Sequence, residues 1–123
     1  MKVLIVDDST FTRKLVMNAL SGRDYEFIQA DTGGEAVRLY QEHRPNLVLM
    51  DIIMPQKDGL EALKEIKQFD PNAYVVVVTA YGSQKQFIED ILKAGAADII
   101  KKPFKDEELV RTAQIAEHFA STG

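Results

Sequence analysis

The chain has 123 residues, a length that suits one globular domain with a single hydrophobic core. Apolar residues make up 46% and charged residues 28% of the sequence, which matches a folded protein and not a disordered one. The absence of cysteine excludes disulfides, thiolate catalysis and cysteine-ligated zinc. A net charge of −4, with basic residues scattered among acidic ones, argues against direct binding to nucleic acid.

The start of the chain runs directly into a strand pattern and has no signal-peptide features. Its apolar stretches are far shorter than the ~20 residues that a membrane-spanning helix needs. We therefore expect a cytoplasmic protein with no membrane insertion. No linker or low-complexity tract is visible, so residues 1–123 are expected to form one domain, with no output domain after the last helix.

Short apolar runs alternate with longer segments of helical period along the chain. In chain order the runs are Val3–Val6, Tyr25–Ile28, Leu47–Met50, Tyr74–Val78 and Ile99–Ile100. The first, third and fourth runs lack apolar and polar alternation, which is typical of parallel strands buried on both faces. We therefore predict a parallel sheet with these three runs as its central strands and helices on both faces.

The segments between the runs carry apolar stripes at helical spacing. The stripes are Phe11, Leu15, Val16, Ala19 and Leu20; Ala36, Leu39 and Tyr40; Leu60, Leu63 and Ile66; Phe87, Ile88, Ile91 and Leu92; and Leu109, Ala113, Ala116 and Ala120. Helix caps are expected at Ser9 or Thr10, Thr32, Asp58, Ser83 and Asp106. The pattern predicts five βα units in a small doubly wound α/β domain.

Polar side chains follow the apolar runs at the points where the strands are expected to end. They are Asp7 and Asp8 after the first run, Asp51 after the third, Thr79 after the fourth, and Lys101 and Lys102 after the fifth. Ligands of open parallel sheets bind at this edge. A strand order of 2-1-3-4-5 would make the first and third strands neighbours and would bring the three carboxylates together.

Three adjacent carboxylates repel one another, and a hard divalent cation such as Mg²⁺ relieves this repulsion. A carboxylate beside such a metal can attack an activated phosphoryl donor and form an aspartyl phosphate. Lys102 could supply a second cation and Thr79 a hydrogen bond. Each residue alone also has an ordinary explanation as a strand end, a cap or a turn. Their coincidence at four strand ends favours metal-assisted phosphoryl transfer.

Several of these segments together resemble the receiver domains of two-component systems, in particular single-domain chemotaxis regulators. They are Val3–Ser9, Leu47–Pro55 with Asp58 and Gly59, Thr79 with Ala80, and Lys102–Phe104. The resemblance covers essentially the whole chain. It implies a flavodoxin-like fold, phosphorylation by a histidine kinase or a histidine phosphotransfer protein, and phosphorylation-dependent binding to a downstream target protein. Such a protein is not a conventional enzyme, since it catalyses only its own phosphorylation and dephosphorylation.

The resemblance also assigns roles to individual residues. Asp51 would be the phosphoacceptor, and Asp8 and Asp51 would bind Mg²⁺ directly, together with the backbone carbonyl of Ile53. Asp7 would act on the metal through water. Thr79 and Lys102 would contact the phosphoryl group, and the peptide bond from Lys102 to Pro103 would be cis. Alignment of Gly95, Ala96 and Pro103 with the family pattern selects Lys102 and not Lys101.

Three positions depart from the family pattern. Ile99 stands where the family often has an aromatic residue that moves on activation, so an aromatic switch is not expected here. Ile53 and Tyr81 occupy positions that control the access of hydrolytic water, and neither offers a carboxylate or an amide. His43 and His118 are interpreted as surface residues. Ile115 and Phe119 fit either the edge of the core or a docking surface.

Two other functions compete with this one. A phosphatase or mutase similar to the haloacid dehalogenase family would also use an aspartyl nucleophile, but it needs a second aspartate where Ile53 stands, and a cap domain. A receiver-like interaction protein that ignores phosphate is the other alternative. The intact set of Asp7, Asp8, Asp51, Thr79 and Lys102 argues against it.

Overall fold

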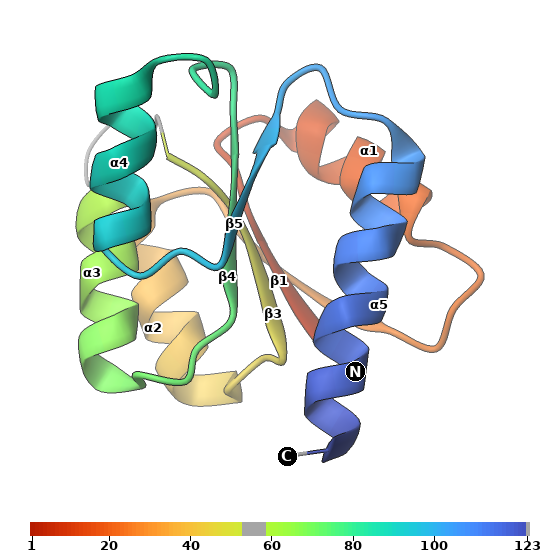
Figure 1. The fold of residues 1–123 in the computed structure, drawn as a ribbon. Helices are drawn as coiled ribbons and strands as arrows, with labels where there is room; N and C mark the ends of the chain where they lie inside the picture. Colours follow the sequence, from red (N-terminus) through yellow and green to blue (C-terminus); the bar gives the residue numbers. More distant parts are fainter. Residues whose placement is uncertain (53–58, 123) are drawn as a thin grey trace.

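A parallel β-sheet forms the middle layer of the computed structural model, which describes residues 1–52 and 59–122 (Figure 1). Its strands are β1 (Lys2–Val6), β2 (Glu26–Ala30), β3 (Leu47–Asp51), β4 (Val75–Thr79) and β5 (Asp98–Lys101). Their order is β2-β1-β3-β4-β5, and all neighbours are parallel. The predicted order is therefore confirmed, and the strand order reverses between β1 and β3.

Helices cover both faces of the sheet. Those within the described residues are α1 (Thr10–Ala19), α2 (Gly33–His43), α3 (Gly59–Phe69), α4 (Lys85–Lys93) and α5 (Asp106–Thr122). Figure 1 shows α2, α3 and α4 on one face and α1 and α5 on the other. No helix in this part of the chain combines the length and the apolar content that crossing a bilayer requires.

The central strands contribute side chains to two separate cores. In β1, Leu4 and Val6 pack toward α2, α3 and α4, whereas Val3 and Ile5 pack toward α1 and α5. Successive side chains of a strand point to opposite faces, so a continuous apolar run serves both cores. All residues of β3 and β4 are buried as well, which confirms the interpretation of the unbroken apolar runs.

The α1 stripe is narrower than its apolar residues predict. Val16 and Leu20 are buried, but Phe11 and Leu15 of the same predicted stripe are 71% and 42% exposed. Each residue of a helix is rotated by about 100° from the one before it, so Leu15 lies well to one side of Val16. Leu92 of α4 and Ala120 of α5 also belong to predicted stripes and are exposed.

Helix starts follow the capping predictions in part. The side chains of Ser9 and Thr32 each accept a hydrogen bond from a backbone N–H in the first turn of α1 and α2. Ser83 was predicted to cap α4, but Gln84 occupies that position and makes no side-chain capping bond. Asp106 is the first residue of α5 and not its cap. Its carboxylate still lies in the first turn, where negative charge is favourable.

A polar cluster joins the C-terminal ends of α2 and α3. The Tyr40 hydroxyl donates a hydrogen bond of 2.7 Å to Asp70 Oδ2, and Arg44 Nη1 lies 3.5 Å from the same oxygen. The guanidinium of Arg44 also lies 4.3 Å from the ring centroid of Phe69. The hydrogen bond from Tyr40 lowers the pKa of Asp70 despite its partial burial, and the backbone N–H of Asn72 and the charge of Arg44 add to this effect.

The lowered pKa of Asp70 predicts a pH-dependent contribution to stability. A carboxylate with a lowered pKa stabilises the folded state above its unfolded-state pKa of about 4, and this stabilisation is lost as the pH falls through the folded-state pKa. We expect Asp70→Asn to reduce the free energy of unfolding by about 1 kcal/mol at neutral pH. Urea titrations followed by circular dichroism should show a smaller difference at about pH 3.

The control for this experiment is Asp24→Asn, which changes an exposed carboxylate in the loop before β2. It should alter the free energy of unfolding by less than about 0.5 kcal/mol. An Asp70→Asn difference of the same size at both pH values would contradict the assignment of this stabilisation to the charged form of Asp70.

Candidate functional site

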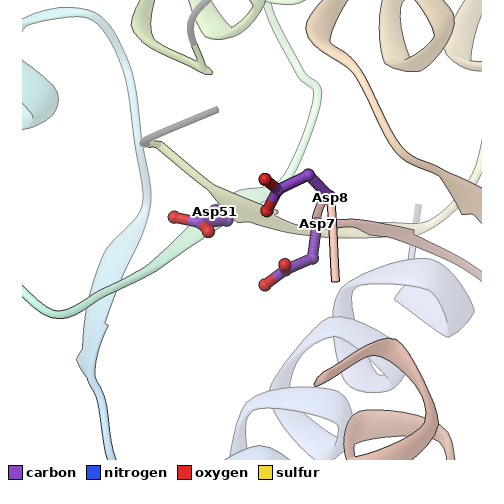
Figure 2. Close-up of side chains that lie close together, drawn as sticks. All are labelled: Asp7, Asp8 and Asp51. Atoms are coloured by element: carbon purple, nitrogen blue, oxygen red, sulfur yellow. The ribbon is translucent and has the colours of Figure 1, made fainter. Parts of the chain in front are cut away.

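Three carboxylates meet at the carboxyl edge of the sheet. Asp7 and Asp8 follow β1, and Asp51 is the last residue of the neighbouring strand β3. One carboxylate oxygen from each residue lies within 4.8 Å of the other two, and Figure 2 shows the three side chains gathered at the ends of these strands. Asp7 and Asp51 are only 4% and 8% exposed, whereas Asp8 is open to solvent. The structure thus brings together the three aspartates that the sequence placed at this edge.

Lys102 brings a positive charge to the same place. Its ammonium nitrogen lies 3.0 Å from Asp7 Oδ2 and 3.2 Å from Asp51 Oδ2. Burial alone lowers the pKa of Lys102, but hydrogen bonding to Asp7 and the charges of Asp51 and Asp7 outweigh burial, so the net effect raises it. Lys102 therefore stays charged. The neighbouring Lys101 is exposed, and it is Lys102 that reaches the aspartates.

The fifth predicted site residue, Thr79, ends β4 and is fully buried. Its Oγ1 accepts a hydrogen bond of 3.1 Å from the backbone N–H of Tyr81, which leaves the hydroxyl proton available for another acceptor. The backbone N–H of Lys102 donates to the carbonyl of Thr79 at 2.8 Å, so the ends of β4 and β5 are tied together. The peptide bond between Lys102 and Pro103 is cis, as the family resemblance implies.

The remaining candidates divide into two groups. Ile53, expected to offer a backbone carbonyl to the metal, and Asp58, expected to cap α3, lie outside the described residues. His43 ends α2 and His118 lies near the end of α5, so both helix ends lie away from the carboxylates, as predicted. Ile99 of β5 is half-buried against the core beneath α2, α3 and α4.

One residue of the site was not identified from the sequence. Arg13, in the second turn of α1, donates a hydrogen bond of 2.6 Å from Nη1 to the main-chain oxygen of Asp7. The acceptor is a backbone atom, which every residue possesses, so no residue type in the sequence marks the contact. Only the position of Arg13 on the helix that follows the two aspartates could have suggested it.

The charges of the cluster suit a metal ion. Three carboxylates and one ammonium leave a negative balance in a partly buried place, and the oxygen atoms are the ligands that hard divalent cations prefer. Lys102 holds one oxygen each of Asp7 and Asp51, so it offsets only part of the negative charge. The residues present therefore fit a divalent cation.

A model of the response regulator receiver domain matches residues 3–114 of the chain. The chain belongs to the response regulator receiver family. Chemotaxis protein CheY of Bacillus subtilis is 44% identical over 110 residues, which cover 89% of this receiver and 91% of that protein. Chemotaxis protein CheY of Thermotoga maritima is 46% identical over 110 residues, with the same two coverages.

A solved structure supports the same assignment. CheY in the CheX–CheY–BeF3–Mg complex of Borrelia burgdorferi is 36% identical and superposes with a TM-score of 0.87, over 94% of this chain and 87% of that one. The receiver is accordingly a two-component response regulator, a protein that is phosphorylated on aspartate, and belongs to a class of regulators and not of classical enzymes. Family membership decides against the phosphatase or mutase alternative.

The two ion pairs of Lys102 predict a stability effect that its neighbour lacks. Lys102→Met would leave two buried carboxylates without their cation, whereas Lys101→Met removes an exposed charge from the adjacent position. With a chelator present, we expect Lys102→Met to reduce the free energy of unfolding by about 2 kcal/mol, less than for a fully buried pair because Lys102 is partly exposed. Lys101→Met should cost less than about 0.5 kcal/mol. Equal losses in urea titrations of the two variants would show that the ion pairs contribute nothing particular to stability.

Proposed function

We propose that Asp51 accepts a phosphoryl group from a phosphohistidine of a kinase or a histidine phosphotransfer protein, and that the phosphorylated form binds a downstream target protein. The observation that carries the proposal is the position of Asp51 at the end of a central strand, beside two further carboxylates and 3.2 Å from the ammonium of Lys102. In this role, residues 1–123 would act as one receiver domain.

The cation of the proposed reaction is Mg²⁺. Asp8 and Asp51 would hold it directly, Asp7 would act through water, and the backbone carbonyl of Ile53 would complete the protein ligands. When bound, the cation would neutralise charge on the oxygens of the transferring phosphoryl group. The relative from Borrelia burgdorferi, whose complex contains magnesium and BeF3, supports this choice of metal.

The chemical step is a nucleophilic substitution at phosphorus. A carboxylate oxygen of Asp51 forms a bond to phosphorus while the bond between phosphorus and the donor's imidazole nitrogen breaks, and the imidazole keeps that electron pair. Asp51 thereby becomes an acyl phosphate. In this role the receiver catalyses its own modification and, with water as the acceptor, its own dephosphorylation.

Lys102 and Thr79 would respond to the new group. Phosphorylation replaces one negative charge at residue 51 by roughly two and places them on oxygens that extend beyond the original carboxylate. The ammonium of Lys102, which already contacts Asp51, is attracted toward these oxygens. The buried hydroxyl of Thr79, whose oxygen already accepts from Tyr81, has a proton to donate to them. The shift of Lys102 and the new hydrogen bond from Thr79 would carry the signal from the site to the surface that the target binds.

The partners follow from the same proposal. The donor must bring a phosphohistidine to the carboxyl edge of the sheet, and the target must distinguish the two states of that edge. The CheX–CheY complex from Borrelia burgdorferi supports readout by a protein partner. The cytoplasmic location expected from the sequence stays a prediction, which cell fractionation with a specific antibody would test.

Phosphorylation by a small donor tests the proposal directly. The protein incubated with acetyl phosphate and Mg²⁺ should gain the mass of one phosphoryl group, and peptide mapping should locate it on Asp51. Asp51→Asn and a chelator should each abolish the gain, while Asp98→Asn, at an exposed position of β5, should label normally. Label on another residue, or equal labelling of Asp51→Asn, would refute the proposal. Normal labelling with a chelator present would refute its metal requirement.

The lifetime of the phosphorylated state should depend on Tyr81 and Ile53. Neither side chain offers a carboxylate or an amide to position the attacking water, and Tyr81 is exposed next to Thr79 and packs edge-on against Phe87. The double variant Ile53→Asn with Tyr81→Glu should hydrolyse its acyl phosphate at least about tenfold faster, because a positioned polar group assists the attack of water.

A matched control separates positioning from added charge. Ser83→Glu places a carboxylate at an exposed position two residues beyond Tyr81 and should leave the hydrolysis rate close to that of wild type. The rates can be followed by loss of the phosphorylated mass after removal of the donor. An unchanged rate in the double variant would show that the lack of a polar group at these two positions does not limit hydrolysis.

A further inference from the structure

Asp7 is held at each of its polar atoms. Its N–H donates to the Ala30 carbonyl at 3.1 Å, its carbonyl accepts from Arg13 Nη1 at 2.6 Å, its Oδ1 accepts from the Ser9 N–H at 2.9 Å, and its Oδ2 accepts from Lys102 Nζ at 3.0 Å. Of these four bonds, the one from Arg13 acts on the peptide unit that joins Asp7 to Asp8, because the Asp7 carbonyl belongs to that unit.

The guanidinium of Arg13 is itself fixed. Its Nε donates to Gln29 Oε1 of β2 at 3.0 Å, and its Nη2 donates to Thr10 Oγ1 at the start of α1 at 3.1 Å. With the bond to Asp7, three nitrogen atoms of one planar group contact the end of β1, strand β2 and helix α1. A planar group held at three points has a defined orientation, so it constrains the carbonyl that it binds.

Asp8 depends on this constraint more than its neighbours do. Asp7 and Asp51 are buried and bonded to Lys102, whereas the Asp8 carboxylate is exposed, and within the described residues no hydrogen bond or ion pair holds it. Figure 2 shows the Asp8 side chain beside Asp51 at the end of β1. The direction in which this side chain leaves the main chain is therefore set by the backbone that carries it. The Asp7–Asp8 peptide is the first part of that backbone.

We propose that Arg13 is a positioning residue for the divalent cation: by holding the Asp7–Asp8 peptide, it keeps Asp8 directed toward Asp51 and so increases the affinity of the site. This inference rests on the proposed function, since the cation is the one required there. Groups that orient metal ligands through hydrogen bonds commonly change metal affinity by about tenfold or more.

Because Arg13 is charged, the proposal can be tested by whether its removal strengthens or weakens cation binding. A guanidinium near the site repels a cation, so its removal would strengthen binding if charge were its only influence. Loss of positioning would weaken binding. Arg13→Ala thus gives opposite results for the two explanations, and Arg13→Lys keeps the charge while losing the planar three-point attachment.

The experiment is a titration of the metal-free protein with MgCl2, followed by the backbone amide chemical shifts of the residues around Asp8. We expect Arg13→Ala to raise the dissociation constant about tenfold and Arg13→Lys to raise it by a smaller factor. The matched control is Lys14→Ala, which removes a neighbouring exposed charge from the same helix. It should leave the dissociation constant unchanged or slightly lower it.

A second variant covers the case in which Arg13→Ala does not fold. Gln29→Ala removes one anchor of the guanidinium at an exposed position and should raise the dissociation constant by about threefold, the equivalent of one modest hydrogen bond. An equal or lower dissociation constant in Arg13→Ala, or an unchanged one in Gln29→Ala, overturns the proposal. So does an equal rise in Lys14→Ala. A wild-type protein that does not bind Mg²⁺ would instead refute the metal requirement of the proposed function, and this inference with it.

Discussion

The two ion pairs of Lys102 are the interaction on which the arrangement of the site depends. Lys102 follows β5, whereas Asp51 ends β3, so the lysine side chain reaches across the end of the intervening strand β4. Its second partner, Asp7, follows β1. One ammonium group therefore connects the ends of three strands that are not all neighbours. Any change of charge at residue 51 alters the balance between the contacts of Lys102 with Asp51 and with Asp7. A chemical change on one side chain can thereby shift contacts at the ends of all three strands.

The rest of the fold supplies a rigid base for this edge. The central strands are buried on both faces and shared between two cores, so a strand cannot shift without disturbing the packing of helices on each side. The cluster of Tyr40, Arg44 and Asp70 fixes the ends of α2 and α3 at the opposite edge of the sheet. Contacts that can change without disturbing this packing are therefore concentrated in the loops that follow the strands, where the candidate site lies.

The sequence predicted most of the fold and the composition of the site, for one physical reason. Parallel strands buried on both faces appear as unbroken apolar runs, and the residue that follows each run lies at a known edge. Asp7, Asp51 and Thr79 could therefore be placed together from the sequence alone. Features that depend on the rotation of a helix about its axis, or on contacts with backbone atoms, could not be predicted from the sequence. A stripe of apolar residues does not tell how far a helix is turned, so the exposure of Phe11 could not be read from it. The contact of Arg13 with a carbonyl has no counterpart in residue type.

The outer strands of the sheet have a further consequence for how the molecule behaves in a crowded solution. An unpaired strand edge can recruit strands from other molecules and so start aggregation. The outer strand β2 carries exposed Glu26 and Gln29, and the other outer strand, β5, is only four residues long, with Asp98 and Lys101 exposed at its two ends. Short strands with charged or polar side chains are poor templates for added strands. Both edges of the sheet are therefore poorly suited to nonspecific pairing with strands of other molecules.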